Sequence, residues 1–244
     1  MLLLEDLAPI RSGGNNYAFC SLEEAELAIA EIARFHATWW DSPRLAKLTW
    51  LRREAQFYQG LHEGYLERWT SFADRVGHTM PAAVLAIGER FGRNPGDYWH
   101  VMLEPPQTII HWDFNLGSLL FLATSGDRLS LAVIDWQTVS IGRSMYDVAQ
   151  FLGRHLSPEN RQAKETALLK MYHSILVEYG VRGYSFDQCW RDYRRFMLTD
   201  LLKAVYLIGG EGMPKGEVDA FSNFVLPGCC NALLDLDVGE LLPK

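Results

Sequence analysis

Two aspartates in the middle of the chain, Asp113 and Asp135, have a sequence setting that suits chemistry. Each comes at or just after a short apolar run, residues 109–110 for the first and residues 131–134 for the second. Such runs predict β-strands, and side chains at the end of a strand leave the sheet and can converge. Two carboxylates placed in this way are typical of an active site rather than of a buried core.

The spacing of His111, Asp113 and Asp135 fits phosphoryl transfer. Kinase catalytic loops read His-x-Asp, have a metal-binding side chain five residues after the Asp, and are followed by a second metal-binding Asp. Here the fifth residue is Ser118, where the pattern has Asn. We expect Asp113 to accept the proton of an attacking hydroxyl, and Asp135, with Ser118, to hold Mg²⁺ against the phosphates. The serine predicts weak metal binding or none.

Around these residues the chain resembles the aminoglycoside phosphotransferase and ecdysteroid-kinase-like family of small-molecule kinases. The resemblance extends to residues 2–9, which look like the hinge between the two lobes of that family, and to residues 34–40, 184–185, 190–195 and 234–237. It implies an α+β, protein-kinase-like fold, with a mainly helical C-terminal lobe whose short β-hairpins carry the catalytic loop. The resemblance covers that lobe nearly end to end.

The same resemblance implies ATP and Mg²⁺ as cofactors and a hydroxyl of a small molecule as the acceptor. Adenine would meet the hinge backbone at Glu5, Asp6 and Leu7. In the family an Asp at the position of Asp147 ties the catalytic loop to the following helix; alternatively, Asp147 simply suits the dipole of that helix.

His111 and Asp113 each have an alternative interpretation. In the family the ring at the position of His111 orients the catalytic loop through hydrogen bonds, whereas an ordinary strand-end histidine would be satisfied by the backbone. A direct role of His111 as general base is less favoured, because Asp113 takes that position. An isolated Asp113 would be an ordinary turn residue, but its pairing with Asp135 at hairpin spacing favours the catalytic interpretation.

The resemblance also predicts the domain organisation, with residues 1–10 as a remnant of the hinge strand and residues 11–244 as a truncated C-terminal lobe. In the family a β-rich lobe with a phosphate-gripping lysine precedes the hinge. We therefore expect impaired transfer, in a fragment or in one half of a split kinase. The alternative is a non-catalytic kinase-like binding or regulatory module, and a metal-dependent hydrolase is a distant third. An exposed hinge surface would favour a homo-oligomer or a separate N-terminal-lobe partner.

Composition narrows the class of protein. The 244 residues carry a net charge of -7 with 23 Lys+Arg, which predicts neither nucleic-acid binding nor attraction to a membrane surface, and a cationic or neutral acceptor is easier to reconcile with it. The apolar run at residues 1–4 is too short for a signal peptide or a membrane span. The four cysteines form no metal-binding pattern, which favours a reduced, cytoplasmic chain.

Capping signals and apolar periodicity predict a largely helical chain. Residues 11–16 are rich in turn formers and should end the first strand, and Ser21 and Glu24 form a capping box. His36, in the helix that follows, is expected to be structural, and Ser144 is expected to cap a helix. Further helices are predicted over residues 50–76, 81–91, 157–179, 185–209 and 218–236. Four acidic residues are candidates for contacting a basic substrate, although solvated or capping charges are the commoner case: Asp187, Asp192, Asp200 and Glu211.

Overall fold

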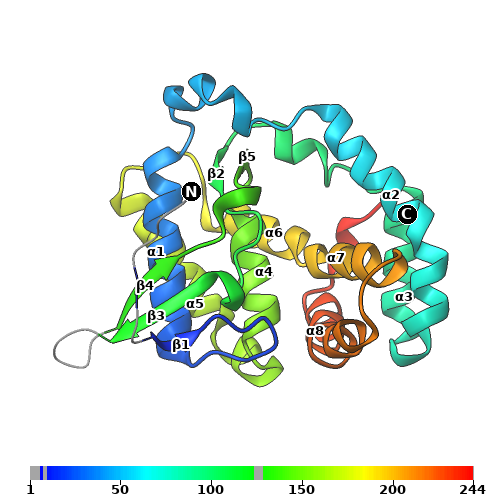
Figure 1. The fold of residues 1–244 in the computed structure, drawn as a ribbon. Coiled ribbons are helices and arrows are strands. Elements are labelled where there is room, and N and C mark those ends of the chain that lie inside the picture. Colours follow the sequence, from blue (N-terminus) through cyan, green and yellow to red (C-terminus); the bar gives the residue numbers. More distant parts are fainter. Residues whose placement is uncertain (1–5, 8–9, 124–128, 244) are drawn as a thin grey trace.

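The computed structural model describes residues 6–7, 10–123 and 129–243, and it has an α+β architecture in which helices predominate (Figure 1). One antiparallel sheet has the strand order β1-β3-β4, and a second pairs β2 with β5. The fold class expected from the sequence is therefore confirmed. The strands are β1 (Ile10–Gly13), β2 (Thr108–Ile110), β3 (Leu119–Ala123), β4 (Leu129–Val133) and β5 (Ser140–Gly142).

The α-helices supply most of the buried core. They are α1 (Leu22–Trp39), α2 (Ala55–Val76), α3 (Ala82–Arg93), α4 (Met145–His155), α5 (Pro158–Glu178), α6 (Phe186–Phe196), α7 (Leu198–Gly209) and α8 (Lys215–Asp235). Helix α4 lies centrally and packs against α6, α7 and α8, while α1 packs against α5 and α2 against α7. Figure 1 shows the three-stranded sheet beside α1 on one side of the molecule, and α2 and α3 on the opposite side.

Short 3-10 helices connect these elements. They are η1 (Pro43–Lys47), η2 (Thr49–Leu51), η3 (Gly77–Thr79), η4 (His100–Leu103), η5 (Leu116–Ser118), η6 (Trp136–Thr138) and η7 (Val238–Leu241). Two of them, η5 and η6, flank the residues that the sequence marks as functional. None of the helices in the described ranges is long and apolar enough to cross a membrane.

Capping boxes start two of the helices, as predicted. The Ser21 hydroxyl accepts a hydrogen bond from the Glu24 amide at 3.2 Å, and the Glu24 carboxylate accepts one from the Ser21 amide at 2.8 Å. Ser185 and Gln188 make the same reciprocal pair at the start of α6. Each cap satisfies amides that a helix start leaves without partners and is worth about 1 kcal/mol.

Three helix predictions were wrong in detail. The helix predicted over residues 185–209 is divided at Met197 into α6 and α7, which both pack against α4, and α7 packs in addition against α2 and α8. Helix α2 begins at Ala55, and Trp50, which lies before it in η2, is 72% exposed rather than packed. Ser144 already has helical backbone angles and makes no capping hydrogen bond, so it does not act as the predicted N-cap.

The turn predicted at residues 11–16 is also wrong in part, because β1 occupies its first half. Residues 10–13 pair antiparallel with β3, and this pairing overrides the local preference for a turn. Gly13 has φ +103°, and a Cβ placed there would lie 2.0 Å from the carbonyl oxygen of Leu119. Only glycine permits that approach, which brings β1 against the start of β3.

Candidate active site

His111 is the first residue of the loop that leaves β2, residues 111–118, which we call the 111–118 loop. Its ring is fully buried. The Nδ1 atom accepts a hydrogen bond from the Asp113 amide at 3.3 Å, and Nε2 donates to the carbonyl oxygen of Ile134 at 2.7 Å. Because a carbonyl can only accept, the ring carries its proton on Nε2. The ring thus joins the loop to the end of β4, one residue before Asp135.

The Asp147 carboxylate holds the loop from the opposite side. It accepts hydrogen bonds from the backbone amides of His111 at 2.7 Å and Trp112 at 2.9 Å, and the ring of His36 lies 3.3 Å from it. All of these groups are buried, apart from the partly exposed Trp112, and the hydroxyl of Tyr172 lies 2.8 Å from the other ring nitrogen of His36. Asp147 therefore ties the loop to α4, and His36 supports Asp147 from α1.

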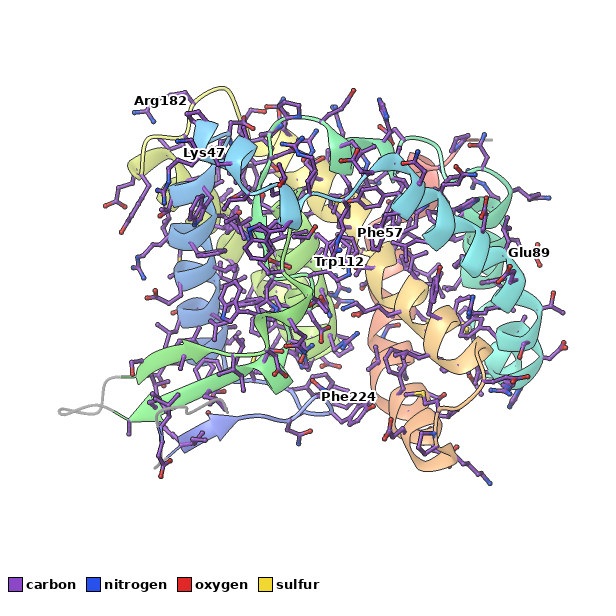
Figure 2. The ribbon with its side chains drawn as sticks, turned by 45° about the horizontal axis from the view of Figure 1, so that its top comes forward. Lys47, Phe57, Glu89, Trp112, Arg182 and Phe224 are labelled. Atoms are coloured by element: carbon purple, nitrogen blue, oxygen red, sulfur yellow. The ribbon has the colours of Figure 1, made fainter. Side chains whose placement is uncertain are left out.

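Trp112 has a left-handed backbone conformation, with φ +72°. A non-glycine residue at such an angle costs of the order of 1 kcal/mol or more and persists only where its surroundings hold it. Trp112 is held by the bond to Asp147 and by stacking on Tyr146, with ring centroids 4.6 Å apart. Figure 2 shows its side chain in the middle of the molecule, close to Phe57 of α2. The side chain of the next residue, Asp113, is partly exposed.

The Asp113 carboxylate is held through one of its two oxygens. Its Oδ1 atom accepts hydrogen bonds from Lys203 Nζ at 2.6 Å and from Gln150 Nε2 at 3.1 Å, whereas Oδ2 has no partner among the described residues. Burial alone would raise the pKa of Asp113, but the charge of Lys203 and these two bonds outweigh it and lower the pKa to about 2. Burial lowers the pKa of Lys203, and the charge of Asp113 opposes that shift.

Ser118 directs its hydroxyl back into the loop. The hydroxyl donates to the carbonyl oxygen of Asp113 at 3.1 Å, and the side chain is almost completely buried. The amide of Asn115 donates to the same carbonyl at 3.1 Å. Within the described part of the chain no hydrogen bond joins Ser118 to Asp135. The structure therefore does not present Ser118 as an open ligand position beside that carboxylate.

Asp135 lies at the start of η6 in a left-handed conformation, with φ 63°, which aspartate tolerates better than most residues. Its side chain is exposed, and no hydrogen bond or ion pair to its carboxylate occurs among residues 6–7, 10–123 and 129–243. Proteins usually hold Mg²⁺ through one or two carboxylates, together with waters and substrate phosphates. Asp135 fits that pattern, whereas Ser118 in its present position does not. The described residues contain no group of three or more His, Cys, Asp or Glu side chains that could hold a metal ion.

The structure describes two of the three residues expected at the hinge, Asp6 and Leu7. Glu5 lies outside the described residues. Asp6 is exposed and Leu7 is partly buried, both outside helices and strands. Neither lines the pocket beside Asp113 described next.

A pocket of about 350 Å³ opens beside Asp113. Its walls come from α2, the 111–118 loop, η6, α4 and α7, together with Trp99. The lining residues are Leu61, Trp99, Trp112, Asp113, Thr138, Tyr146, Leu202, Lys203, Tyr206 and Leu207. A larger hollow of about 620 Å³ lies near the C-terminal end of the chain and contains none of the predicted site residues. The pocket beside Asp113 therefore places an open volume next to one of the predicted site residues.

Sequence reasoning missed Lys203 and Gln150, the two side chains that hold Asp113. Lys203 is the one cation in α7. The other polar side chains of this helix are those of Thr199, Asp200 and Tyr206. A lone lysine in such a helix is a signal that could have been followed, since a buried cation needs a partner. Gln150 lies in α4, all of whose residues are buried.

Two of the acidic candidates, Asp192 and Asp200, are neither solvated nor available to a substrate. Asp200 forms a buried ion pair with Arg154, and Asp192 pairs with Arg195 at 2.9 Å and with Arg143 at 3.5 Å. The expectation of solvated charges was wrong for these two, because each faces an arginine from a neighbouring part of the fold. Asp187 is exposed, as a helix-start charge usually is.

Comparison with known proteins agrees with the resemblance seen in the sequence. Residues 106–208, which include the 111–118 loop and Asp135, match the model of a family described as "Uncharacterized oxidoreductase dhs-27". Among solved structures, the chain is similar to a "putative aminoglycoside phosphotransferase" from Ralstonia eutropha JMP134, with a TM-score of 0.51 and 16% identity, over 100% of this chain and 72% of that one. No curated protein matches the chain.

The structural similarity defines the class of fold, which is that of the kinase-like phosphotransferases. The fold that the resemblance in the sequence implied is therefore the fold that this solved structure shares with the chain.

Proposed function

We propose that the protein transfers the terminal phosphoryl group of ATP to a hydroxyl of a small molecule, with Asp113 as the base and Asp135 as the ligand of Mg²⁺. The observation that carries the proposal is the state of Asp113. Its carboxylate, with a pKa lowered to about 2, is fixed through Oδ1 and lines a pocket, and its Oδ2 has no partner among the described residues.

The low pKa of Asp113 is compatible with this role. Phosphoryl transfer passes through a loose transition state in which positioning and charge stabilisation contribute more than proton abstraction. A carboxylate held by Lys203 and Gln150 can orient the acceptor hydroxyl through Oδ2 and receive its proton late in the reaction. His111 and Asp147 contribute by fixing the backbone on either side of Trp112.

The exposed carboxylate of Asp135 would hold the metal ion. When bound, Mg²⁺ neutralises charge on the phosphates. Because Ser118 is engaged with the carbonyl of Asp113, the protein supplies a single side-chain ligand from this pair, and weak metal affinity follows.

Transfer from ATP in the presence of Mg²⁺ to a panel of neutral and charged hydroxyl compounds, followed by ³¹P NMR, tests the proposal. Asp113→Asn should lower kcat/KM by roughly 10²- to 10⁴-fold, the usual effect of losing a positioned base. Asp74→Asn, which changes an exposed aspartate on α2 that does not line the pocket, is the matched control and should have no effect. An Asp113→Asn variant as active as the wild type would exclude this role for Asp113.

A second candidate, a non-catalytic kinase-like module, is favoured by the burial of Ser118. If the metal site is too weak to function, the fold would bind a metabolite or a partner subunit, including a separate N-terminal lobe or a second copy of the chain. Calorimetry with ATP and Mg²⁺, which measures binding, and the ³¹P NMR assay, which measures turnover, together distinguish the two candidates. Nucleotide or acceptor binding without turnover, in the wild type and in Ser118→Asn alike, supports the module, whereas turnover gained in Ser118→Asn supports a kinase with a weakened metal site.

A further inference from the structure

We propose that the pocket beside Asp113 takes a neutral, apolar hydroxyl compound and disfavours polycationic acceptors of the aminoglycoside type. This inference rests on the proposed function, because it names the acceptor class of the same site.

The walls of the pocket are mainly aromatic and aliphatic. Trp99, Trp112 and Tyr146 contribute rings, and leucines from α2 and α7 complete the lining. Trp112 stacks on Tyr146, so the two rings form one continuous surface. At about 350 Å³ the pocket lies at the lower end of the range of roughly 300–1,000 Å³ that is usual for small-molecule sites. Such a surface gains most from a ligand that buries apolar area.

The charges at the pocket disfavour a cation. Asp113 is the one carboxylate among the lining residues, and Lys203 already pairs with it at 2.6 Å. A polycation would meet the ammonium of Lys203 and a single carboxylate that this ammonium already neutralises. The residues that line this pocket therefore do not share the negative net charge of the whole chain, which is -7.

The hydroxyl groups of the walls are mostly engaged with the backbone. Thr138 donates to the carbonyl oxygen of His111 at 3.1 Å, and Tyr206 donates to that of Leu61. Oδ2 of Asp113 remains the carboxylate oxygen without a partner in the described part of the chain. A ligand with one hydroxyl beside that oxygen and an apolar body fits this arrangement, since the aromatic and aliphatic walls favour buried apolar area over further polar groups.

Two compounds of the same shape test the charge preference with the full chain. Calorimetric titration with 2-naphthalenemethanol and with 2-naphthalenemethylamine, which is an ammonium ion at neutral pH, compares a neutral and a cationic ligand on the same rings. The alcohol should bind at least tenfold more tightly, and kanamycin should bind more weakly than the alcohol. Equal or tighter binding of the amine or of kanamycin, or no binding of the alcohol, would overturn the inference.

A variant at the mouth of the pocket tests the location. Leu207 lines the pocket and is 41% exposed, so Leu207→Trp should fold and should weaken alcohol binding at least tenfold by filling the space. Val177→Trp is the matched control, because Val177 on α5 is 43% exposed and does not line this pocket. Circular dichroism checks that both variants are folded. The inference fails if Leu207→Trp binds the alcohol as tightly as the control does. If Leu207→Trp is unfolded, the wild type decides, and the absence of a preference for the alcohol contradicts the inference.

The cation itself is tested by Lys203→Met. Removing the ammonium should reduce the preference for the alcohol over the amine by several fold, since Asp113 would then be free to pair with the amine. An unchanged preference would show that Lys203 does not set the charge of the pocket.

Failure of this inference can be distinguished from failure of the proposed function. Alcohol binding without phosphorylation of any compound contradicts phosphotransfer and leaves the acceptor class standing. Phosphorylation of kanamycin in preference to neutral alcohols overturns the acceptor class and supports phosphotransfer.

Discussion

The two aspartates at the centre of the site, Asp113 and Asp135, are held in opposite ways. Asp113 follows a loop whose backbone is fixed by Asp147 and His111, and its own carboxylate is paired with Lys203. Asp135 is exposed, in a left-handed conformation, and its carboxylate has no partner within the described ranges. Under the proposed function, this difference means that the orientation of Asp113 is built into the fold, whereas a metal site at Asp135 would have to be completed by the ion and the phosphates.

The largest expected effect is the loss of the anchor of the loop. Asp147→Ala leaves the buried amides of His111 and Trp112 without an acceptor, at a cost of about 1–3 kcal/mol for each group, so we expect the free energy of unfolding to fall by about 3 kcal/mol. Urea denaturation measures this change. Asp187→Ala, on the exposed surface, should change stability by no more than about 0.5 kcal/mol. A loss below about 1 kcal/mol in Asp147→Ala would mean that the loop is not fixed from α4.

The next effect is a loss of stability at acidic pH, which we expect from His155, the buried histidine that binds the 111–118 loop. His155 Nε2 accepts the Leu116 amide at 3.1 Å, and its other ring nitrogen faces the carbonyl of Ala18 at 2.9 Å. Burial lowers the pKa of His155 to about 3, below the value of about 6.5 expected in the unfolded chain. Below pH 6.5 the unfolded state therefore binds the extra proton, and stability falls as the pH falls, down to the folded pKa.

The slope expected for one proton is about 1.4 kcal/mol per pH unit, which gives a loss of about 2 kcal/mol between pH 6.5 and pH 5. Denaturation at a series of pH values in the wild type and in His155→Gln measures it. The variant should be less stable at neutral pH, because the ring's two bonds change, but its stability should vary less over this interval. Parallel curves for the two proteins would assign the acid sensitivity to other groups.

A smaller effect is expected from the ion pair between Asp113 and Lys203. Lys203→Met removes the main group that lowers the pKa of Asp113, so that this pKa should rise from about 2 towards the ordinary value of about 3.9, while the bond from Gln150 and the charge of Arg154 continue to oppose the effect of burial. In the wild type the stability due to this shift is present above about pH 4 and is lost as the pH falls through about 2. NMR titration of the Asp113 carboxyl carbon measures the pKa directly.

At neutral pH the same variant should lose about 1 kcal/mol of stability, since the Asp113 side chain is 44% exposed and the pair is partly screened. Lys203→Arg keeps the charge and is the control. An unchanged Asp113 pKa in Lys203→Met would remove the contrast between the two aspartates.

The smallest effect on stability is expected at Asp135. Asp135→Gly relieves the left-handed conformation and removes no partner within the described residues, so the free energy of unfolding should change by less than about 1 kcal/mol, or rise. Mg²⁺-dependent nucleotide binding, measured by calorimetry, should nevertheless be lost. Asp135→Asn serves as the control for stability, because asparagine keeps the preference for the left-handed backbone conformation. A large loss of stability in Asp135→Gly would show that Asp135 is structural.

The parts of the fold that the sequence predicted well are those governed by neighbours along the chain. Ser21 with Glu24, and Ser185 with Gln188, start helices through contacts within three residues. The break at Met197 was missed because it depends on what α6 and α7 pack against. The strand at residues 10–13 was missed for the same reason, since its partner lies more than a hundred residues away.

The candidate site shows the same division. The spacing from His111 to Asp135 identified the loop and the hairpin, because these residues are close in sequence. Lys203 and Gln150 come to Asp113 from α7 and α4, and Ser118 turns its hydroxyl inward for reasons of loop geometry. Periodicity and composition carry no information on such long-range approaches. The charge of the pocket could not be predicted either, because the net charge of the chain says nothing about the residues that line one pocket.

Because Lys203 lies on α7, ninety residues after the loop, the sign of the charge that a ligand meets is encoded separately from the residues that orient it. A single codon change at position 203 could alter which molecules are accepted while the buried bonds from His111 and Asp147 stayed intact. Such a scaffold can drift between ligands over evolutionary time without rebuilding its centre, and variation at this one helical position among relatives would record that history.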